Sequence, residues 1–138
     1  MVKNLKGVMK PMIKITGLHH LSIAITNLEK SKYFYGEILG LPELRRPNFD
    51  FEGAWYQVGN QQLHLIVFPE SKTLRKSEEI ITVDSHFALE VTDYQQTLAY
   101  LTKHDVPLVE NIGTKSGFKQ IFCLDPDQNI IEMNFGAK

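Results

Sequence analysis

The chain repeats one pattern of residues, and this repeat limits its possible folds more than any other feature. An alternating apolar and polar segment begins at His20, and the helix-capping residue Asn27 follows it. A second alternating segment begins at His86 and is followed by the equivalent capping residue Asp93. His20 and His86 lie 66 positions apart, and so do Asn27 and Asp93. One offset shared by two landmarks predicts an internal duplication.

Each copy of the repeat is expected to contain a strand, a helix and three further strands. Apolar residues at helical spacing occupy residues 28–39 of the first copy, with Gly40 as a suitable stop, and residues 94–101 of the second. The later strands are expected at residues 43–46, 54–58 and 62–68, and at residues 108–110, 119–124 and 129–135. This pattern predicts an α+β fold.

Composition and length indicate one globular domain with an extension. Of the 138 residues, 43% are hydrophobic and 22% are charged, which excludes a disordered chain. We expect residues 1–13 to form a flexible N-terminal extension and residues 14–138 to form a single domain. The first module covers about residues 14–68, a linker residues 69–82, and the second module about residues 83–135. The charged linker is interpreted as a solvated connector, with a lid over a site as the alternative.

Charge and cysteine content narrow the expected partners and compartment. The net charge of -1 lacks the basic excess that is typical of nucleic-acid binders. The N-terminal residues, among which Met12 is an alternative start, contain no unbroken apolar run, so neither a signal peptide nor a membrane span is expected there. The single cysteine, Cys123, cannot form an intramolecular disulfide and is expected in the core. We therefore expect a cytoplasmic protein with a small-molecule partner and without nucleic-acid or membrane partners.

Four polar residues occupy equivalent places in the two copies. Each copy offers a histidine in its first strand, His20 or His86, and a second polar residue in its last strand, His64 or Glu132. Imidazole and carboxylate suit a divalent ion of zinc, iron, nickel, cobalt or manganese. Taken singly, such residues are more often structural, and a nearby Lys or Arg would also offset the cost of burying Glu132. His19 falls on the opposite face of its strand from His20 and is not expected to be a ligand.

Further residues are candidates for binding a substrate. Arg46 could hold a carboxylate or phosphate at two points, with an exposed strand-end arginine as the alternative. Trp55 and Tyr56 point to opposite faces, so only one of them can line a cavity. Lys119 is expected at the mouth of the pocket.

Several segments resemble the vicinal oxygen chelate superfamily, which includes glyoxalase I, methylmalonyl-CoA epimerase, fosfomycin-resistance proteins, extradiol dioxygenases and bleomycin-resistance proteins. The matching segments are residues 18–28, 33–41, 86–91 and 125–132. The resemblance implies two βαβββ modules that form an open eight-stranded barrel-like sheet around a metal, with the helices outside. It also implies metal ligands at His20, His86 and Glu132, and at His64, where glyoxalase I has Glu or Gln.

The resemblance implies an enzyme and leaves its reaction open. A glyoxalase-like isomerase or lyase would use metal-assisted proton transfer, with Glu132 and His64 as catalytic residues and with glutathione or another thiol as a conceivable cofactor. A ring-cleaving dioxygenase would use His20, His86 and Glu132 to hold the metal. A non-catalytic drug- or metabolite-binding protein is the third alternative. A homodimer is also implied, and the site could lie within one chain or between two.

Overall fold

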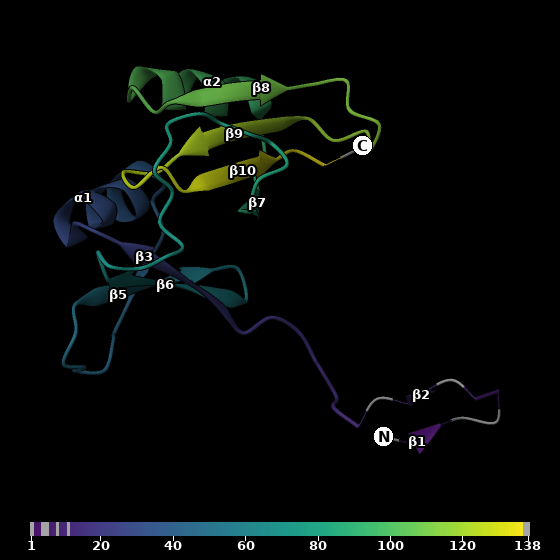
Figure 1. The fold of residues 1–138 in the computed structure, drawn as a ribbon. Coiled ribbons are helices and arrows are strands. Elements are labelled where there is room, and N and C mark those ends of the chain that lie inside the picture. Colours follow the sequence, from purple (N-terminus) through teal and green to yellow (C-terminus); the bar gives the residue numbers. More distant parts are fainter. Residues whose placement is uncertain (1, 4–5, 8, 11, 137–138) are drawn as a thin grey trace.

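The computed structural model describes residues 2–3, 6–7, 9–10 and 12–136, and it shows the predicted α+β fold with two βαβββ modules (Figure 1). The first module consists of β3 (His20–Ile25), α1 (Leu28–Lys32) with its continuation η1 (Tyr33–Ile38), β4 (Glu43–Leu44), β5 (Gly53–Val58) and β6 (Gln61–Val67). The second consists of β7 (His86–Glu90), α2 (Tyr94–Lys103), β8 (Leu108–Asn111), β9 (Gln120–Leu124) and β10 (Ile130–Asn134).

Both modules pair their strands in the same order. The first sheet runs β3-β6-β5-β4 and the second runs β7-β10-β9-β8. In each sheet the first strand is parallel to the last, and the other neighbours are antiparallel. Within the described residues, the eight strands expected from the resemblance are present as two separate four-stranded sheets that do not close into a barrel. Among the described strands, β3 and β7 are therefore open edges.

The helices begin where the capping residues predict. The Asn27 side chain accepts a hydrogen bond from the backbone N–H of Lys30, and Asp93 accepts one from Gln96. After Lys32 the first helix widens into the π-helix η1, which the sequence did not predict. Gly40 then has a φ of 70°, a left-handed conformation that glycine adopts without strain.

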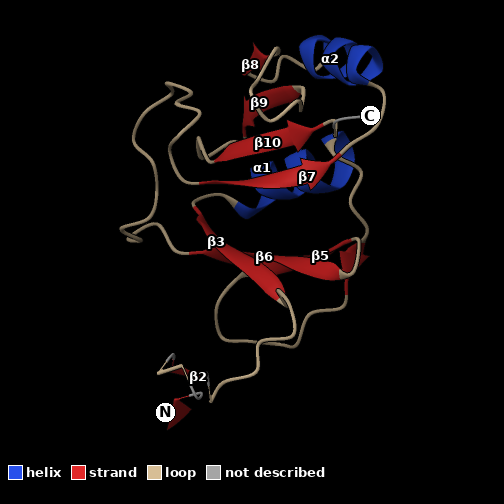
Figure 2. Ribbon diagram, turned by 90° about the vertical axis from the view of Figure 1, so that its right-hand side faces the viewer, coloured by secondary structure: helices blue, strands red, loops and turns tan. Residues whose placement is uncertain are grey.

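One apolar core joins the modules. It includes buried side chains from the first sheet, such as Tyr56 and Leu65, and from the second, such as Ile131 and Met133. Figures 1 and 2 show the two sheets one above the other, with α1 between them. Because both sheets turn one face to this shared core, their other faces point away from it.

The turn before β10 joins the modules through polar contacts as well. Thr26, at the end of β3, donates from its backbone N–H and its hydroxyl to the Asp127 carboxylate. Tyr35 of η1 donates its hydroxyl to Asp125 at 2.6 Å. These hydrogen bonds fix how the second module sits on the first.

The linker contacts the second module. Arg75 donates to the carbonyl of Gln128 at 2.8 Å and pairs with the Asp84 carboxylate at 3.5 Å. Ile80 packs against a small buried cluster on the second sheet: Phe122, Leu124 and Ile130. Because Phe122 pairs with Glu132 across the strands, the linker covers part of the face that bears Glu132.

The N-terminal segment contains two short paired strands, β1 (Val2–Lys3) and β2 (Met9–Lys10). The expectation of a flexible extension over residues 1–13 stays a prediction, because residues 1, 4–5, 8 and 11 lie outside the described part of the chain. None of the helices among the described residues has the length and apolar character that crossing a membrane requires.

Candidate metal centre

The four predicted ligands lie on the faces of the sheets that point away from the shared core. In β6, His64 alternates with Leu63 and Leu65, whose side chains face the core. The register pairs His64 with Ser22 of β3 and with Trp55 of β5, so these side chains and His20 share one face. In the second sheet, the register places Glu132 and His86 on one face in the same way.

His86 and Glu132 form a pair of groups that point at each other. His86 Nδ1 donates to the backbone carbonyl of Asp84 at 2.7 Å, and its Nε2 lies 3.2 Å from Glu132 Oε1. The other carboxylate oxygen, Oε2, accepts a hydrogen bond from Asn134 at 2.8 Å. The Asp84 carbonyl thus fixes the ring so that Nε2 faces the carboxylate, and metal-binding histidines are commonly held by the same kind of hydrogen bond from their other ring nitrogen.

This pair fits a divalent ion. Two ligand atoms at about 2.0–2.2 Å from one ion and at a right angle lie about 3 Å apart. The 3.2 Å between His86 Nε2 and Glu132 Oε1 matches that separation. An ion could therefore lie between these two atoms with little movement of either side chain.

His20 and His64 are arranged differently. Their rings are stacked with centroids 4.1 Å apart and planes 17° apart, and Trp55 stacks on the other side of His64 at 4.1 Å and 6°. His64 Nε2 donates to Gln62 Oε1 at 2.9 Å, while His20 Nδ1 lies 2.9 Å from His19 Nδ1. Because lone pairs lie in the ring plane, two parallel rings cannot aim them at one ion. Joint ligation by His20 and His64 therefore requires one ring to rotate.

The electrostatics of His64 follow from this stack. The side chain is only 7% exposed, because the His20 and Trp55 rings stack on its two sides. Burial lowers the pKa of His64, and the neighbouring His20, His19 and Arg46 lower it further. The neutral form is thereby favoured, with the proton on Nε2 and the lone pair on Nδ1.

The four residues meet as two pairs. Among the described residues there is no group of three or more His, Cys, Asp or Glu side chains that could hold a metal ion. The reason is the shared core, because each sheet turns its opposite face toward the other module. His20 with His64 and His86 with Glu132 are therefore two half-sites within one chain.

Arg46 lies near the first half-site. Its Cζ is 4.8 Å from the Phe49 ring centroid and 5.0 Å from that of Phe51, and its Nη2 donates to the Phe51 carbonyl at 2.8 Å. Phe49 lies 6.1 Å from Trp55, which stacks on His64. Arg46 and Trp55 thus belong to one aromatic cluster that ends at the predicted metal ligands.

Two of the predicted substrate-binding residues lie elsewhere. Tyr56 is 1% exposed and pairs with Leu63 across the strands, so it belongs to the core face and cannot line the same surface as His64. Lys119 precedes the first paired residue of β9, and its Nζ lies 5.5 Å from the Tyr94 ring, against α2. Both are removed from the candidate set for this reason.

The sequence reasoning missed several residues that support the candidate site. Phe49 and Phe51 hold Arg46, Gln62 orients His64, and Asn134 holds the Glu132 carboxylate. The polar pair could have been found by alternation, because Gln62 and Asn134 lie two residues from a ligand on the same strand and therefore on the same face. Nothing periodic marks the two phenylalanines, which lie in a loop.

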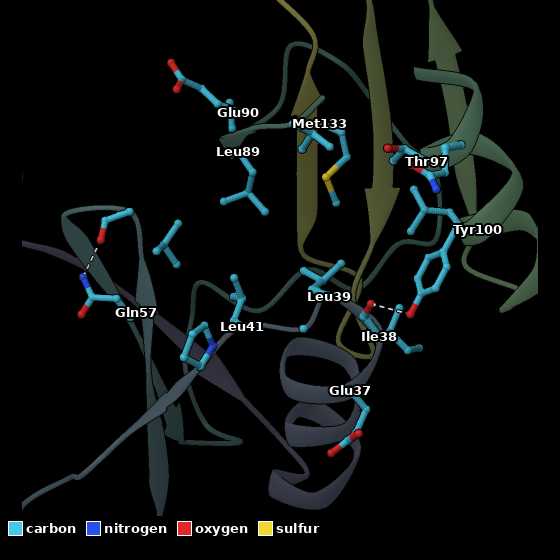
Figure 3. A pocket seen from close by; sticks show the side chains of 18 of the residues that line it. Glu37, Ile38, Leu39, Leu41, Gln57, Leu89, Glu90, Thr97, Tyr100 and Met133 are labelled. Carbon is cyan, nitrogen blue, oxygen red and sulfur yellow. Dashed lines mark hydrogen bonds between the residues drawn. The ribbon is translucent and has the colours of Figure 1, made fainter. Parts of the chain in front are cut away.

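A groove of about 1090 Å³ lies between the modules and away from these residues (Figure 3). Apolar side chains from both modules line it, among them Leu39, Leu41, Leu89 and Met133. None of the four candidate ligands lines the groove. It extends along the open edge of β7.

Comparison with known proteins identifies the family. The profile of the Glyoxalase/Bleomycin resistance protein/Dioxygenase superfamily matches residues 17–133. The chain belongs to this superfamily. The match spans both modules, and the family resemblance seen in the sequence is thereby confirmed.

Individual members of the superfamily are similar over most of the chain. Glyoxylase I 4 from Arabidopsis thaliana is 29% identical over 124 residues, which are 88% of this chain and 71% of the relative. A glyoxalase family protein from Bacillus anthracis has a TM-score of 0.73 at 23% identity, over 93% of this chain and 99% of its own. A variant of the fosfomycin resistance protein FosX from Listeria monocytogenes has a TM-score of 0.73 at 15% identity, over 89% and 94%. The two structures support the fold.

One of these solved structures contains a metal ion. The FosX structure is a complex with Mn(II) and 1S,2S-dihydroxypropylphosphonic acid.

Proposed function

We propose that this member of the superfamily is a divalent-metal-dependent enzyme that catalyses proton transfer on a small substrate, as an isomerase or lyase. The observation that carries the proposal is the His86–Glu132 pair, whose facing atoms already have the separation of two metal ligands. The similarity to Glyoxylase I 4 supports a lyase-type reaction. When bound, the ion polarises substrate oxygens and stabilises the negative charge that develops on them.

The chain's own residues have different roles in the proposed reaction. Asp84 and Asn134 hold His86 and Glu132 in the orientation that an ion needs. Glu132 also serves as the carboxylate that exchanges a proton with the substrate. His64, whose Nδ1 carries the lone pair, acts as the fourth ligand or as the second proton-transfer group.

We further propose that the complete site forms between two chains of a homodimer. One chain turns its two half-sites away from each other, so a second copy must supply the facing half. The open edges of β3 and β7 offer backbone groups for such an association. Large apolar side chains near these edges are exposed to solvent, which also supports an interface: Ile13, Ile15, Leu18 and Val83.

Metal content tests the proposal. Protein purified without a histidine tag is reconstituted with Zn, Ni, Fe, Mn or Co and analysed by plasma mass spectrometry. We expect near-stoichiometric metal in the wild type and its loss in His20→Ala and Glu132→Ala. His19→Ala and His104→Ala, which replace histidines outside the half-sites, serve as matched controls and keep the metal. A wild type without metal under all conditions contradicts the proposed enzyme and favours a non-catalytic binding protein.

Complementation tests the shared site. One protein carries His20→Ala with His64→Ala, and the other carries His86→Ala with Glu132→Gln. If sites form between chains, unfolding and refolding the two together yields heterodimers with one intact site, and about a quarter of the wild-type metal content returns. If sites form within one chain, the mixture stays as empty as its components.

A ring-cleaving dioxygenase is the second candidate. His20, His86 and Glu132 provide the two histidines and one carboxylate that bind Fe(II) in such enzymes, and Trp55 offers an aromatic surface beside His64. The identity of the bound metal determines which of two activity assays is carried out first. Oxygen consumption with a catechol would support the dioxygenase, and turnover of a hemithioacetal of glutathione would support the lyase.

A further inference from the structure

Arg46 carries a positive charge that the protein does not neutralise. Its guanidinium is half-buried and held in place by the rings of Phe49 and Phe51 and by the Phe51 carbonyl. Within the described residues, no carboxylate lies within ion-pair distance of it. Its Nε is buried and has no hydrogen-bond partner there, and Nη1 also makes no hydrogen bond in this part of the chain.

Such an arrangement is costly in the free protein. A buried donor without a partner loses its hydrogen bonds to water and forms none in the protein. The free-energy cost of this desolvation is larger for a charged group. The aromatic rings also fix the plane of the guanidinium, so the side chain loses less conformational entropy when a ligand binds. The fixed plane and the Nη1 atom without a hydrogen bond favour the binding of an anion that supplies an acceptor to Nη1.

The surface beside Arg46 is aromatic. Phe49 and Phe51 stack with centroids 5.0 Å apart and planes 11° apart, yet they remain 42% and 43% exposed. Trp55 lies 6.1 Å from Phe49 and continues the stack to His64. A flat ligand would cover these exposed faces and gain the stacking energy that aromatic pairs provide.

The chemistry of the anion follows from the number of cations. Arg46 is the one cation among the described contacts of this cluster. A single planar guanidinium matches the geometry and single charge of a carboxylate, whereas phosphate groups carry up to two charges and three acceptor oxygens. The neighbouring Arg45 is exposed and has no such aromatic support, which makes it a suitable comparison.

We propose that the cluster of Arg46, Phe49, Phe51 and Trp55 binds the substrate, and that this substrate is a planar aromatic or conjugated carboxylic acid. The carboxylate pairs with Arg46 and the flat body lies against Phe49 and Trp55. The proposal rests on the proposed function in one respect, because it takes the bound acid to be the substrate of the metal centre that His64 adjoins.

Tryptophan fluorescence offers a direct test, because Trp55 is the single tryptophan of the chain. The full-length protein is titrated with benzoate, with uncharged benzamide and with propionate, which has the carboxylate without the ring. We expect benzoate to bind at least about tenfold more tightly than either of the others. Arg46→Gln should weaken benzoate binding by about tenfold and leave benzamide within twofold, while Arg45→Gln leaves both unchanged.

Phe49→Leu separates the aromatic contribution. It should weaken benzoate and benzamide, which lose a stacking partner, and weaken propionate less, because propionate loses only the support that the Phe49 ring gives to Arg46. Equal affinities for benzoate and propionate, or a benzoate affinity that does not change in Arg46→Gln, would overturn the proposal. Circular dichroism of each variant establishes that a loss of binding is not a loss of folding.

Metal content distinguishes a failure of this proposal from a failure of the proposed function. Arg46→Gln should keep the wild-type metal content, since Arg46 is not a ligand. If metal binds and the titrations show no dependence on Arg46, the substrate class is wrong and the metalloenzyme remains. If no metal binds and benzoate still binds through Arg46, the cluster binds acids and the enzyme proposal fails.

Discussion

Replacing Tyr35 by phenylalanine removes one hydrogen bond at the contact between the modules. Tyr35 is fully buried, and its hydroxyl donates to Asp125 Oδ2 at 2.6 Å. The Asp125 carboxylate is 4% exposed and accepts three further hydrogen bonds, from the backbone N–H of Asp127 and from the backbone and side chain of Asn129. Phenylalanine fills nearly the same space, so the loss is that of a hydrogen bond without a cavity.

The size of the effect follows from the charge and burial of the acceptor. Hydrogen bonds to charged groups contribute roughly 1.5–3 kcal/mol, and the three remaining donors keep the loss in the lower half of that range. We therefore expect Tyr35→Phe to lower the free energy of unfolding by about 2 kcal/mol. For a chain of this length, that corresponds to a decrease in Tm of roughly 6–10 °C.

The effect should depend on pH. Burial raises the pKa of Asp125, whereas the hydrogen bond from Tyr35 lowers it. Because the folded-state pKa lies above the unfolded one, the folded protein takes up this proton more readily as the pH falls. The Tyr35 hydroxyl stabilises the ionised form of the Asp125 carboxyl. Without it, protonation of Asp125 is more favourable in the folded state, so acidification stabilises the fold of the variant more than that of the wild type. The destabilisation by Tyr35→Phe should therefore be smaller at about pH 5 than at neutral pH.

Urea unfolding, followed by Trp55 fluorescence at one fixed protein concentration, measures the difference. Tyr33→Phe is the matched control, because Tyr33 lies in the same helix, is 57% exposed and has a hydroxyl that makes no hydrogen bond with the described residues. If the two variants differ by less than about 0.5 kcal/mol, or if the loss grows on acidification, the assigned role of the Tyr35–Asp125 contact is wrong.

Three further predictions concern other parts of the chain. Burial raises the pKa of Cys123 to about 12, so its thiolate fraction near pH 8 is about a thousandfold lower than that of a cysteine with the ordinary pKa. Alkylation of Cys123 should therefore be slow in the native protein and fast in denaturant. Mass spectrometry of the alkylated protein measures both rates. Asn27→Ala and Asp93→Ala should each lower the unfolding free energy by about 1 kcal/mol in urea titrations. The loss should be larger for Asp93, whose φ of 60° alanine tolerates poorly. If the metal centre forms, a chelator should lower the Tm of the wild type and leave that of Glu132→Gln unchanged in calorimetry.

Local patterns were sufficient to predict the modules. Alternation and capping residues at a constant offset located both first strands and both helices, because these signals depend on neighbouring residues alone. The π-helical turn at Tyr33–Ile38 left no such signal. Nor could the sequence show that the sheets remain separate, since that depends on how two distant edges meet.

The candidate site was predictable in its residue types and less so in its faces. Alternation placed Trp55 and Tyr56 on opposite sides, but it took the pairing of Trp55 with His64 to show which of them lies beside the ligands. Lys119 precedes β9, and its ammonium group lies over the Tyr94 ring of α2, a contact between distant segments that alternation does not predict. The support of Arg46 by Phe49 and Phe51 arises in a loop, where no period links sequence to direction.

The duplication explains why the half-sites are alike in geometry and different in chemistry. In the first module His20 pairs with Gln62, and His64 is two residues further along β6. In the second, His86 pairs with Ile130, and Glu132 is again two residues further along. The two pairs therefore occupy equivalent diagonal positions, in which the second residue lies two places beyond the direct partner of the first on the neighbouring parallel strand.

What differs is the group at the end of the diagonal. A carboxylate turns toward the neighbouring imidazole, whereas a second imidazole stacks on it and on Trp55. The second module thus holds two candidate ligands that face each other, whereas ion binding by both candidates of the first would require one ring to leave the stack. Since the shared core points both pairs of residues outward, the proposed homodimer is the arrangement that would bring one pair of each kind together.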